Sequence, residues 1–72
     1  MNKKVEELKK NFCKNIKIER KNRHLTQKEV ALAIGVTMQS YQAYEDGSAC
    51  PSFDNFLKLS IFFDMPLNEF VE

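Results

Sequence analysis

Apolar residues recur at helical spacing over the first third of the chain. Val5, Leu8, Phe12 and Ile16 follow one another at steps of three and four, which places them on one side of a helix. Lysines occupy many of the other positions in this stretch. The pattern predicts one amphipathic helix from about Lys4 to Asn22, with an apolar side for the core and a basic side for solvent.

The next apolar stretch begins with a helix-start signal. Thr26 can act as an N-cap, and Glu29 stands three residues later, where it completes a capping box. The helix that follows is predicted to run from Gln27 to Ile34. Its buried stripe is predicted to consist of Val30, Ala31 and Ile34.

A tight turn and a second short helix come next. Gly35 stands where the end of a helix favours the left-handed conformation. Thr37 offers another N-cap, which predicts a helix through about Glu45 that ends at Gly47. Two short helices joined by a tight turn containing glycine form the helix-turn-helix arrangement.

The last third of the chain is rich in apolar residues. Pro51 and Ser52 are placed to begin a helix, with Ser52 as N-cap and Asn55 in the first turn. The apolar face of this helix is wide, which predicts that it is the central packing helix of the domain. The residues of this face are Phe53, Phe56, Leu57, Leu59, Ser60, Ile61 and Phe63.

A short fifth helix closes the pattern. Pro66 stands at its predicted first turn, and its apolar residues are Leu67, Phe70 and Val71. No segment alternates apolar and polar residues as a half-buried strand does. Because repeats and low-complexity linkers are also missing, residues 1–72 are predicted to form one compact all-α domain of five helices.

Composition narrows the class of protein. A chain that is 43% hydrophobic and 29% charged is ordinarily globular. No apolar run approaches the roughly 18 residues that a membrane span needs. The N-terminal stretch MNKKVEELKK leads into further charge, so it does not have the apolar core of a signal peptide. We therefore expect a cytoplasmic protein without a membrane segment.

The chain carries no recognisable catalytic or metal-binding motif. Cys13, Cys50 and His24 do not stand at the spacing of metal ligands. The two cysteines could pair, but without a secretory signal they are expected to be reduced thiols. A nucleophile elbow, a phosphate loop and a Gly-rich fingerprint are missing, so we expect neither an enzyme nor a bound cofactor or metal.

Charge is distributed unevenly along a chain whose net charge is only +1. Residues 1–28 hold ten Lys or Arg and three Glu, which is a net charge of +7. Residues 29–72 hold one Lys and seven Asp or Glu, which is a net charge of −6. A basic half suggests a polyanionic partner for one face of the molecule. Charge alone leaves open the alternative that both halves are solvated helix faces.

A spaced motif runs through the predicted helices from Phe12 to Phe70. It consists of Phe12, Ile16, Arg20, Leu25-Thr26-Gln27, Val30-Ala31, Gly35-Val36-Thr37, Tyr41, Tyr44-Glu45, Gly47, Pro51-Ser52-Phe53, Phe56-Leu57, Ser60, Phe63 and Leu67-Asn68-Glu69-Phe70. With this motif the chain resembles the Xre-type (Cro/repressor-like) helix-turn-helix proteins. Residues 1–11 lie outside the match, as an N-terminal extension of the first helix. The resemblance implies a five-helix lambda-repressor-like fold that binds operator DNA, usually as a dimer, and regulates transcription.

The second helix of the motif sorts its residues by face. At about 100° per residue, Tyr41 and Tyr44 lie on the side opposite Met38, Gln42, Gln39 and Ala43. In the similar proteins, the positions of Met38, Gln39 and Ala43 reach base edges in the major groove. Glutamine can pair with adenine and an apolar side chain can cover a thymine methyl group, so this readout needs no charge. We expect Gln39 to read a base and Met38 to contact a thymine, whereas Ala43 is small enough to leave its base pair unread.

Attraction to phosphates is expected from the basic half of the chain. In the family, the position of Gln27 holds a phosphate with its side chain and the positive end of its helix. Lys28 stands beside it, and Lys21 and Arg23 could flank the same strand. The full set of predicted DNA-binding residues is Gln27, Lys28, Met38, Gln39, Ser40, Gln42 and Ala43.

Three further features lie at or beside the second helix of the motif, which is the helix expected to read bases. The family commonly pairs the positions of Arg20 and Glu45 in a buried or half-buried ion pair, so the resemblance implies a structural role for both. Asp46 stands where many relatives carry Asn, and its carboxylate would repel a nearby phosphate. Residues 48–50 replace a loop that is often rich in Lys and Arg. Fewer phosphate contacts predict a modest binder that relies on dimerisation.

The apolar C-terminal residues have two interpretations. They are Phe62, Phe63, Met65, Leu67, Phe70 and Val71. Either all belong to the core, or Phe62 and Val71 form the seam of a homodimer through the C-terminal helices. A two-fold dimer would bind a palindromic operator in double-stranded DNA.

Two functions remain in contention. The preferred one is a sequence-specific, dimeric DNA-binding regulator, a repressor of its own or a neighbouring operon. The alternative is a protein-interaction module of the same fold, such as an antitoxin or an anti-regulator, with weak or no DNA binding. Gln27, Lys28 and Gln39 favour DNA, whereas the acidic half of the chain favours the alternative.

Overall fold

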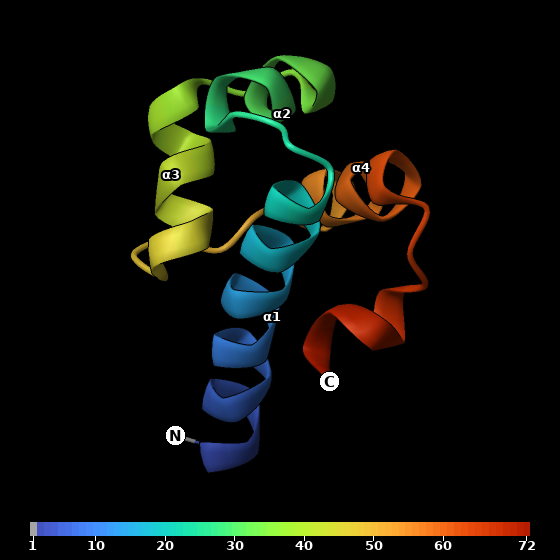
Figure 1. The fold of residues 1–72 in the computed structure, drawn as a ribbon. Helices are drawn as coiled ribbons and strands as arrows, with labels where there is room; N and C mark the ends of the chain where they lie inside the picture. The colour runs from blue at the N-terminus through green and yellow to red at the C-terminus, as the bar shows by residue number, and fades with distance from the viewer. Residues whose placement is uncertain (1) are drawn as a thin grey trace.

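The computed structural model describes residues 2–72, and every regular element among them is helical. The elements are α1 (Lys3–Asn22), α2 (Gln27–Ile34), α3 (Met38–Asp46), α4 (Phe53–Phe63) and the 3₁₀ helix η1 (Leu67–Val71). Figure 1 shows α2 and α3 at one end of the molecule, near the C-terminal end of α1, while η1 folds back beside α1. The prediction of a compact all-α fold is confirmed. Met1, the first residue of the predicted N-terminal extension, lies outside the described residues.

The predicted helix starts depended on local signals, and these signals act in the structure. The Thr26 hydroxyl accepts a hydrogen bond from the Glu29 amide at 3.0 Å, and the Glu29 carboxylate accepts one from the Thr26 amide at 2.8 Å. Ser52 caps α4 in the expected way, since its hydroxyl accepts from the Asn55 amide. Gly35 ends α2 at φ 75°, a left-handed conformation that glycine adopts without steric cost.

The fifth element differs from its prediction in type and start. The chain forms a 3₁₀ helix there, and Pro66 precedes it as N-cap instead of standing inside the first turn. The side-chain amides of Asn11 and Asn15 on α1 donate to the carbonyl oxygens of Val71 and Phe70, both at 2.9 Å. These bonds satisfy carbonyl groups at the end of η1 and fix this element against α1.

The core lies where all five elements meet. Its buried residues are Phe12, Ile16, Val30, Ala31, Ile34, Tyr41, Tyr44, Leu59, Phe63 and Phe70. The Phe70 ring from η1 lies 5.9 Å from the Phe12 ring of α1 and 6.4 Å from the Phe63 ring of α4, measured between ring centroids. Aromatic pairs at such distances stabilise beyond the area they bury. The short C-terminal element is therefore part of the single core.

The prediction that α4 packs with a wide apolar face was wrong. Only Leu59 and Phe63 of this helix are buried, while Phe53 is 68% exposed and Ile61 is 80% exposed. A short helix can turn only one side toward the core, so an apolar residue on the other side stays in solvent. A helix that is apolar nearly all round gives no periodic signal for which side that is. Val5 of the predicted apolar stripe of α1 is also exposed, because the N-terminal turns of α1 extend beyond the other helices (Figure 1).

No helix formed by residues 2–72 has the length and apolar character needed to cross a membrane.

Candidate nucleic-acid interface

Helix α3 turns one side into the core and the other outward. Tyr41 and Tyr44 are buried, as the face analysis predicted. Met38, Gln39 and Ser40 are exposed at its first turns, and Gln42 and Ala43 are half-buried. Figure 1 shows α3 at the edge of the molecule, so its outer side is open to a partner. That side carries uncharged residues from Met38 to Ala43, and the exposed Asp46 follows at the last position of the helix.

A shallow depression joins the outer sides of α2 and α3. Its lining residues are Lys28, Ala31, Leu32, Val36, Met38 and Gln39. The predicted phosphate contact Lys28 and the predicted base contacts Met38 and Gln39 therefore border one concave surface. Leu32 is 80% exposed at this surface and was not among the predicted site residues. Its outward position follows from the helical periodicity of α2, because Leu32 points to the side opposite the buried residues Ala31 and Ile34.

Gln27 and Gln42 connect the two helices of the motif. The Gln42 amide donates to the Gln27 side-chain oxygen at 3.2 Å, and the Gln27 amide donates to Glu45 Oε1 at 3.1 Å. Gln27 thus holds α3 with one of its two amide hydrogens, and the other has no acceptor among residues 2–72. The structure places two of the three predicted DNA-binding glutamines, Gln27 and Gln42, in a bridge between α2 and α3.

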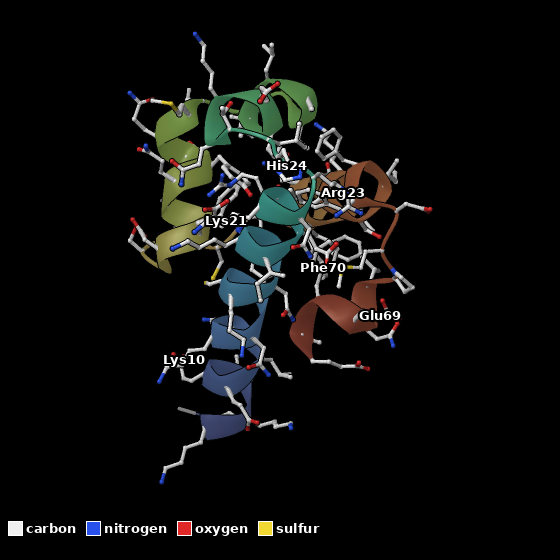
Figure 2. All side chains as sticks on the ribbon, viewed as in Figure 1. Lys10, Lys21, Arg23, His24, Glu69 and Phe70 are labelled. Atoms are coloured by element: carbon white, nitrogen blue, oxygen red, sulfur yellow. The ribbon has the colours of Figure 1, made fainter. Side chains whose placement is uncertain are left out.

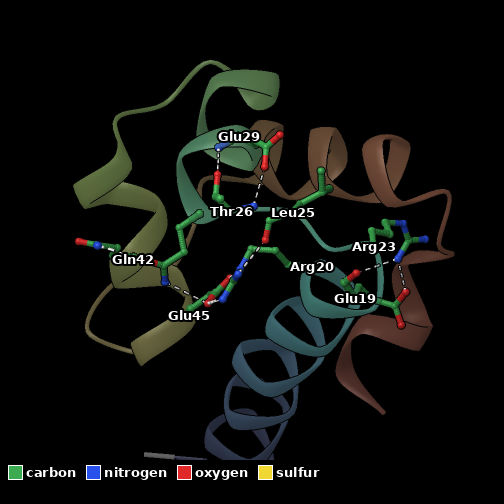
Figure 3. A network of polar contacts seen from close by, with 9 residues as sticks. Glu19, Arg20, Arg23, Leu25, Thr26, Glu29, Gln42 and Glu45 are labelled. Atoms are coloured by element: carbon green, nitrogen blue, oxygen red, sulfur yellow. Dashed lines mark hydrogen bonds and ion pairs between the residues drawn. The ribbon is translucent and has the colours of Figure 1, made fainter.

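Arg20 and Glu45 lie side by side at the base of this bridge. Arg20 Nε lies 2.6 Å from Glu45 Oε2, and a second guanidinium nitrogen donates to Glu45 Oε1 at 3.0 Å. The remaining guanidinium nitrogen of Arg20 donates a hydrogen bond to the carbonyl oxygen of Leu25 at 2.9 Å. The two side chains are only 11% and 4% exposed. Figure 3 shows this pair connecting α1 to the C-terminal part of α3.

The hydrogen bonds of the pair stabilise the charged forms of both side chains. Burial opposes the charged form of Glu45, but hydrogen bonds from Arg20 and Gln27 outweigh it and hold the pKa of this carboxyl below its ordinary value. The hydrogen bond to Glu45 raises the pKa of Arg20. Tyr41 has its hydroxyl buried nearby, without a hydrogen-bond partner among residues 2–72, and burial raises its pKa.

Arg23 does not take the position that the sequence suggested. Its guanidinium donates to the carbonyl oxygen of Phe63 at 2.6 Å, pairs with Glu19, and lies 5.0 Å from the centroid of the Phe63 ring. Figure 3 shows Arg23 and Glu19 on the side of α1 away from Glu45. The expectation that Arg23 flanks a phosphate strand beside Gln27 was wrong, because the side chain is committed to α4.

The last residue of α3, Asp46, carries an exposed negative charge. Asp46 Oδ1 accepts a hydrogen bond from the Ser48 amide at 2.8 Å, and the hydrogen bonds from Ser48 lower the pKa of Asp46. Residues 48–50, in the loop after α3, are exposed. Cys50 in this loop and Cys13 on α1 are both free thiols, and burial raises the pKa of Cys13.

A polar depression brings α1 to the same surface. It is lined by Lys17, Gln27, Gln42, Glu45 and Asp46, so Lys17 borders the residues that connect α2 to α3. Lys17 was not predicted as a site residue, although it is one of several lysines spaced along the first helix. Its position beside α3 depends on how the helices pack, which a helical pattern does not contain.

The two residues of the predicted dimer seam occupy different environments. Phe62 is partly exposed on α4, while Val71 is half-buried on η1. Val71 lines an apolar groove of about 300 Å³. The other lining residues are Val5, Leu8, Lys9, Phe12, Cys50, Pro51, Phe53 and Phe56, and Phe62 is not one of them.

Comparison with known proteins agrees with this geometry. Residues 16–70 match the helix-turn-helix family. The chain is similar to the transcriptional repressor RstR of the cryptic phage CTXphi from Vibrio cholerae, with 40% identity over 60 residues that cover 83% of this chain and 54% of that protein. It is also similar to the uncharacterised HTH-type transcriptional regulator YqaE of Bacillus subtilis, with 37% identity over 57 residues that cover 79% of this chain and 49% of that protein. The chain spans about half the length of the curated relatives it matches. No solved structure matches it.

Proposed function

The chain belongs to the Xre-type helix-turn-helix family, and we propose that it is a sequence-specific DNA-binding regulator that represses transcription as a dimer. The observation that carries this proposal is the division of α3 into a buried tyrosine side and an exposed side that begins with the uncharged residues Met38 and Gln39. The names of the two relatives, a transcriptional repressor and a transcriptional regulator, support it.

The exposed side of α3 reads bases in the major groove. Gln39 can accept a hydrogen bond from adenine N6 and donate one to adenine N7, and Met38 can cover the methyl group of a thymine. Ser40 and Ala43 lie next to them, where a small side chain allows close approach to the base edges or the backbone. Neutral side chains suit this task because sequence is read through hydrogen bonds and apolar contacts, not through charge.

The neighbouring elements set the position of α3 on the duplex. Gln27, at the N-terminal end of α2, has one amide hydrogen without an acceptor among residues 2–72, and the helix dipole there also favours a phosphate. Lys28 adds a positive charge beside it. Because Gln42 donates to Gln27, a phosphate held at Gln27 is coupled to the orientation of α3. The Arg20–Glu45 pair serves the same end by holding α3 on α1.

Dimerisation doubles this small interface. The C-terminal elements supply the apolar surface for it, with Val71 beside the exposed residues Phe53 and Val5. A two-fold dimer places two α3 helices on half-sites separated by about 34 Å, one turn of DNA, and so selects a palindrome.

The direct test compares DNA from the region upstream of the protein's own gene with a random duplex of equal length. We expect the upstream duplex to bind about 1,000-fold more tightly, with both affinities falling as salt increases. Fluorescence anisotropy at four or more salt concentrations measures both. Absence of salt-dependent binding to either duplex at low ionic strength would overturn the proposal.

A second function, docking to a protein partner, is favoured by one specific observation. The only charge exposed at the end of α3 and in the following loop, within residues 38–50, is the negative one of Asp46, and Leu32 adds an exposed apolar side chain nearby. This alternative places a protein on Met38–Gln42. If this alternative holds, the protein has negligible affinity for DNA. Residues Met38–Gln42 are then protected from hydrogen exchange when the partner is bound.

A further inference from the structure

Helix α1 presents a continuous lysine face to solvent. At about 100° per residue, the five lysines on this face point within an arc of about 60°, on the side of the helix opposite Phe12 and Ile16. They are Lys3, Lys10, Lys14, Lys17 and Lys21, and we call them the lysine ridge. With about 1.5 Å of rise per residue, the ridge extends over roughly 27 Å.

The lysines of the ridge form no ion pairs within residues 2–72. All five side chains are exposed. Two other lysines of α1 behave differently, since Lys4 pairs with Glu7 and Lys9 pairs with Glu6. Lysines four apart, such as Lys10 and Lys14, repel one another and weaken a helix. The ridge is thus unfavourable for the isolated fold and suited to an anionic partner.

The ridge joins the proposed DNA-binding surface at Lys17. This residue lines the polar depression together with Gln27 of α2 and Gln42 of α3. Figure 2 shows Lys10 and Lys21 on the side of α1 on which α3 lies, while Glu69 of η1 lies on the other side. A ligand that contacts α3 and the start of α2 can therefore continue along α1.

Apart from Lys28, the proposed interface on α2 and α3 contains no Lys or Arg. No Lys or Arg occurs between Lys28 and Lys58, a stretch that includes all of α3 and the loop after it. Proteins of this kind obtain most of their non-specific affinity from neutralised phosphates. In this chain the ridge is the largest set of exposed Lys side chains without a salt bridge among residues 2–72, and Lys17 brings it beside α3.

We propose that the lysine ridge binds the sugar-phosphate backbone of duplex DNA that flanks the base pairs read by α3. The inference rests on the proposed function, which it deepens by assigning the source of the electrostatic affinity. One strand presents a phosphate about every 3.4 Å along the duplex axis, so the segment from Lys10 to Lys21, roughly 16 Å long, can follow several successive phosphates. The contact extends the footprint beyond the bases and is independent of their sequence.

The test is the salt dependence of binding for the double variant Lys10→Gln/Lys14→Gln. On a 30-base-pair random duplex, the slope of log K against log salt should become shallower by about 1.8, since each neutralised phosphate contributes about 0.9. At 0.15 M salt this corresponds to roughly 30-fold weaker binding. The matched control is Lys4→Gln/Lys9→Gln, which removes the same charge from the same helix at positions outside the ridge. Equal changes in both variants, or no change in either, would overturn the proposal.

A second measurement separates the ridge from the proposed function. Hydroxyl-radical footprinting on the upstream DNA should show that Lys10→Gln/Lys14→Gln loses protection at the outer edge and keeps it at the centre. The preference for upstream over random DNA should be unchanged. A shallower slope without any sequence preference keeps the ridge and overturns the proposed function. An intact preference for upstream DNA with an unchanged slope keeps the proposed function and overturns the ridge. If the unaltered protein binds no duplex, both the ridge and the proposed function are overturned. Thermal melting by circular dichroism verifies that both variants fold, which their exposed positions predict.

Discussion

Arg20 and Glu45 form a two-pronged ion pair across 25 positions of sequence, with nitrogen–oxygen distances of 2.6 and 3.0 Å. The pair holds the C-terminal part of α3 against the C-terminal part of α1. Arg20 also donates to the Leu25 carbonyl oxygen, which lies between α1 and α2. The Arg20 side chain thus links α1 to α3 and to the segment between α1 and α2, so the orientation of the proposed reading helix depends on it.

Removing Glu45 should destabilise the protein strongly. In Glu45→Ala the Arg20 guanidinium stays largely buried without its partner, and such a loss typically reduces the free energy of unfolding by about 3–5 kcal/mol. Urea denaturation at pH 7 measures it. The control is Glu19→Ala, which removes the more exposed pair with Arg23 and should reduce the free energy of unfolding by less than about 1 kcal/mol. Equal stability of the two variants would contradict a supporting role for the pair.

The same pair predicts how stability depends on pH. Because the pKa of Glu45 in the folded protein lies below its ordinary value of 4.5, the folded state binds its proton less readily than the unfolded state does. This contribution to stability is present above pH 4.5 and is lost as pH falls through the lower pKa of the folded state. Unfolding free energies measured from pH 7 downward should therefore decline more steeply for the natural protein than for Glu45→Gln. Parallel curves would show that Glu45 does not titrate differently on folding.

Tyr41 offers a test of a buried polar group without a partner. Its hydroxyl makes no hydrogen bond among residues 2–72, so Tyr41→Phe removes a desolvated group and should leave the melting temperature unchanged or raise it. Tyr44 is the matched control, because its hydroxyl accepts a hydrogen bond from the side-chain amide of Asn55 at 3.3 Å. Tyr44→Phe should lose about 0.5–1.5 kcal/mol. A marked destabilisation by Tyr41→Phe alone would show that its hydroxyl is paired in solution.

The features that sequence predicted well are those determined by near neighbours. Thr26 and Glu29 cap one another across three positions, and Gly35 adopts its left-handed conformation because of the helix it ends. The tyrosine side of α3 could also be assigned, since Tyr41 and Tyr44 differ clearly from the polar residues around them. In each case the physical cause lies within a few residues and can be read directly.

Features that depend on distant partners were missed or wrong. Arg23 contacts the carbonyl oxygen of Phe63, 40 positions away, and no local pattern indicates that this cation serves the fold instead of a phosphate. Ile61 is exposed because of the direction in which α4 packs, which its nearly uniform apolar sequence does not specify. Lys17 lies beside Gln42 only once α1 and α3 are packed.

Gln39 should contribute sequence discrimination and not stability. Gln39→Ala removes one bidentate base contact, which should weaken binding to upstream DNA by about 1–3 kcal/mol and change binding to random DNA little. The contrast is Lys28→Ala, which should weaken both equally and make the salt slope shallower by about one unit. Binding to both duplexes, measured by anisotropy, distinguishes the two roles. Equal weakening of both by Gln39→Ala would show that this residue does not read sequence.

Asp46 carries the exposed charge that opposes DNA at the end of α3. Asp46→Asn removes this charge but keeps the side-chain oxygen that accepts from the Ser48 amide, so the loop should retain its conformation. If a phosphate lies nearby, loss of the repulsion should strengthen binding to upstream and random DNA by the same factor.

The matched control for Asp46→Asn is Asp64→Asn at the C-terminal end of α4. Asp64 has a φ of 52°, a conformation that Asn adopts readily, so the variant should fold and lose the same charge far from α3. Titrations of both variants at low and moderate salt measure the difference. Equal gains would reflect net charge alone. No gain from Asp46→Asn at either salt concentration would place this carboxylate away from the backbone, as expected if α3 docks to a protein and not to DNA.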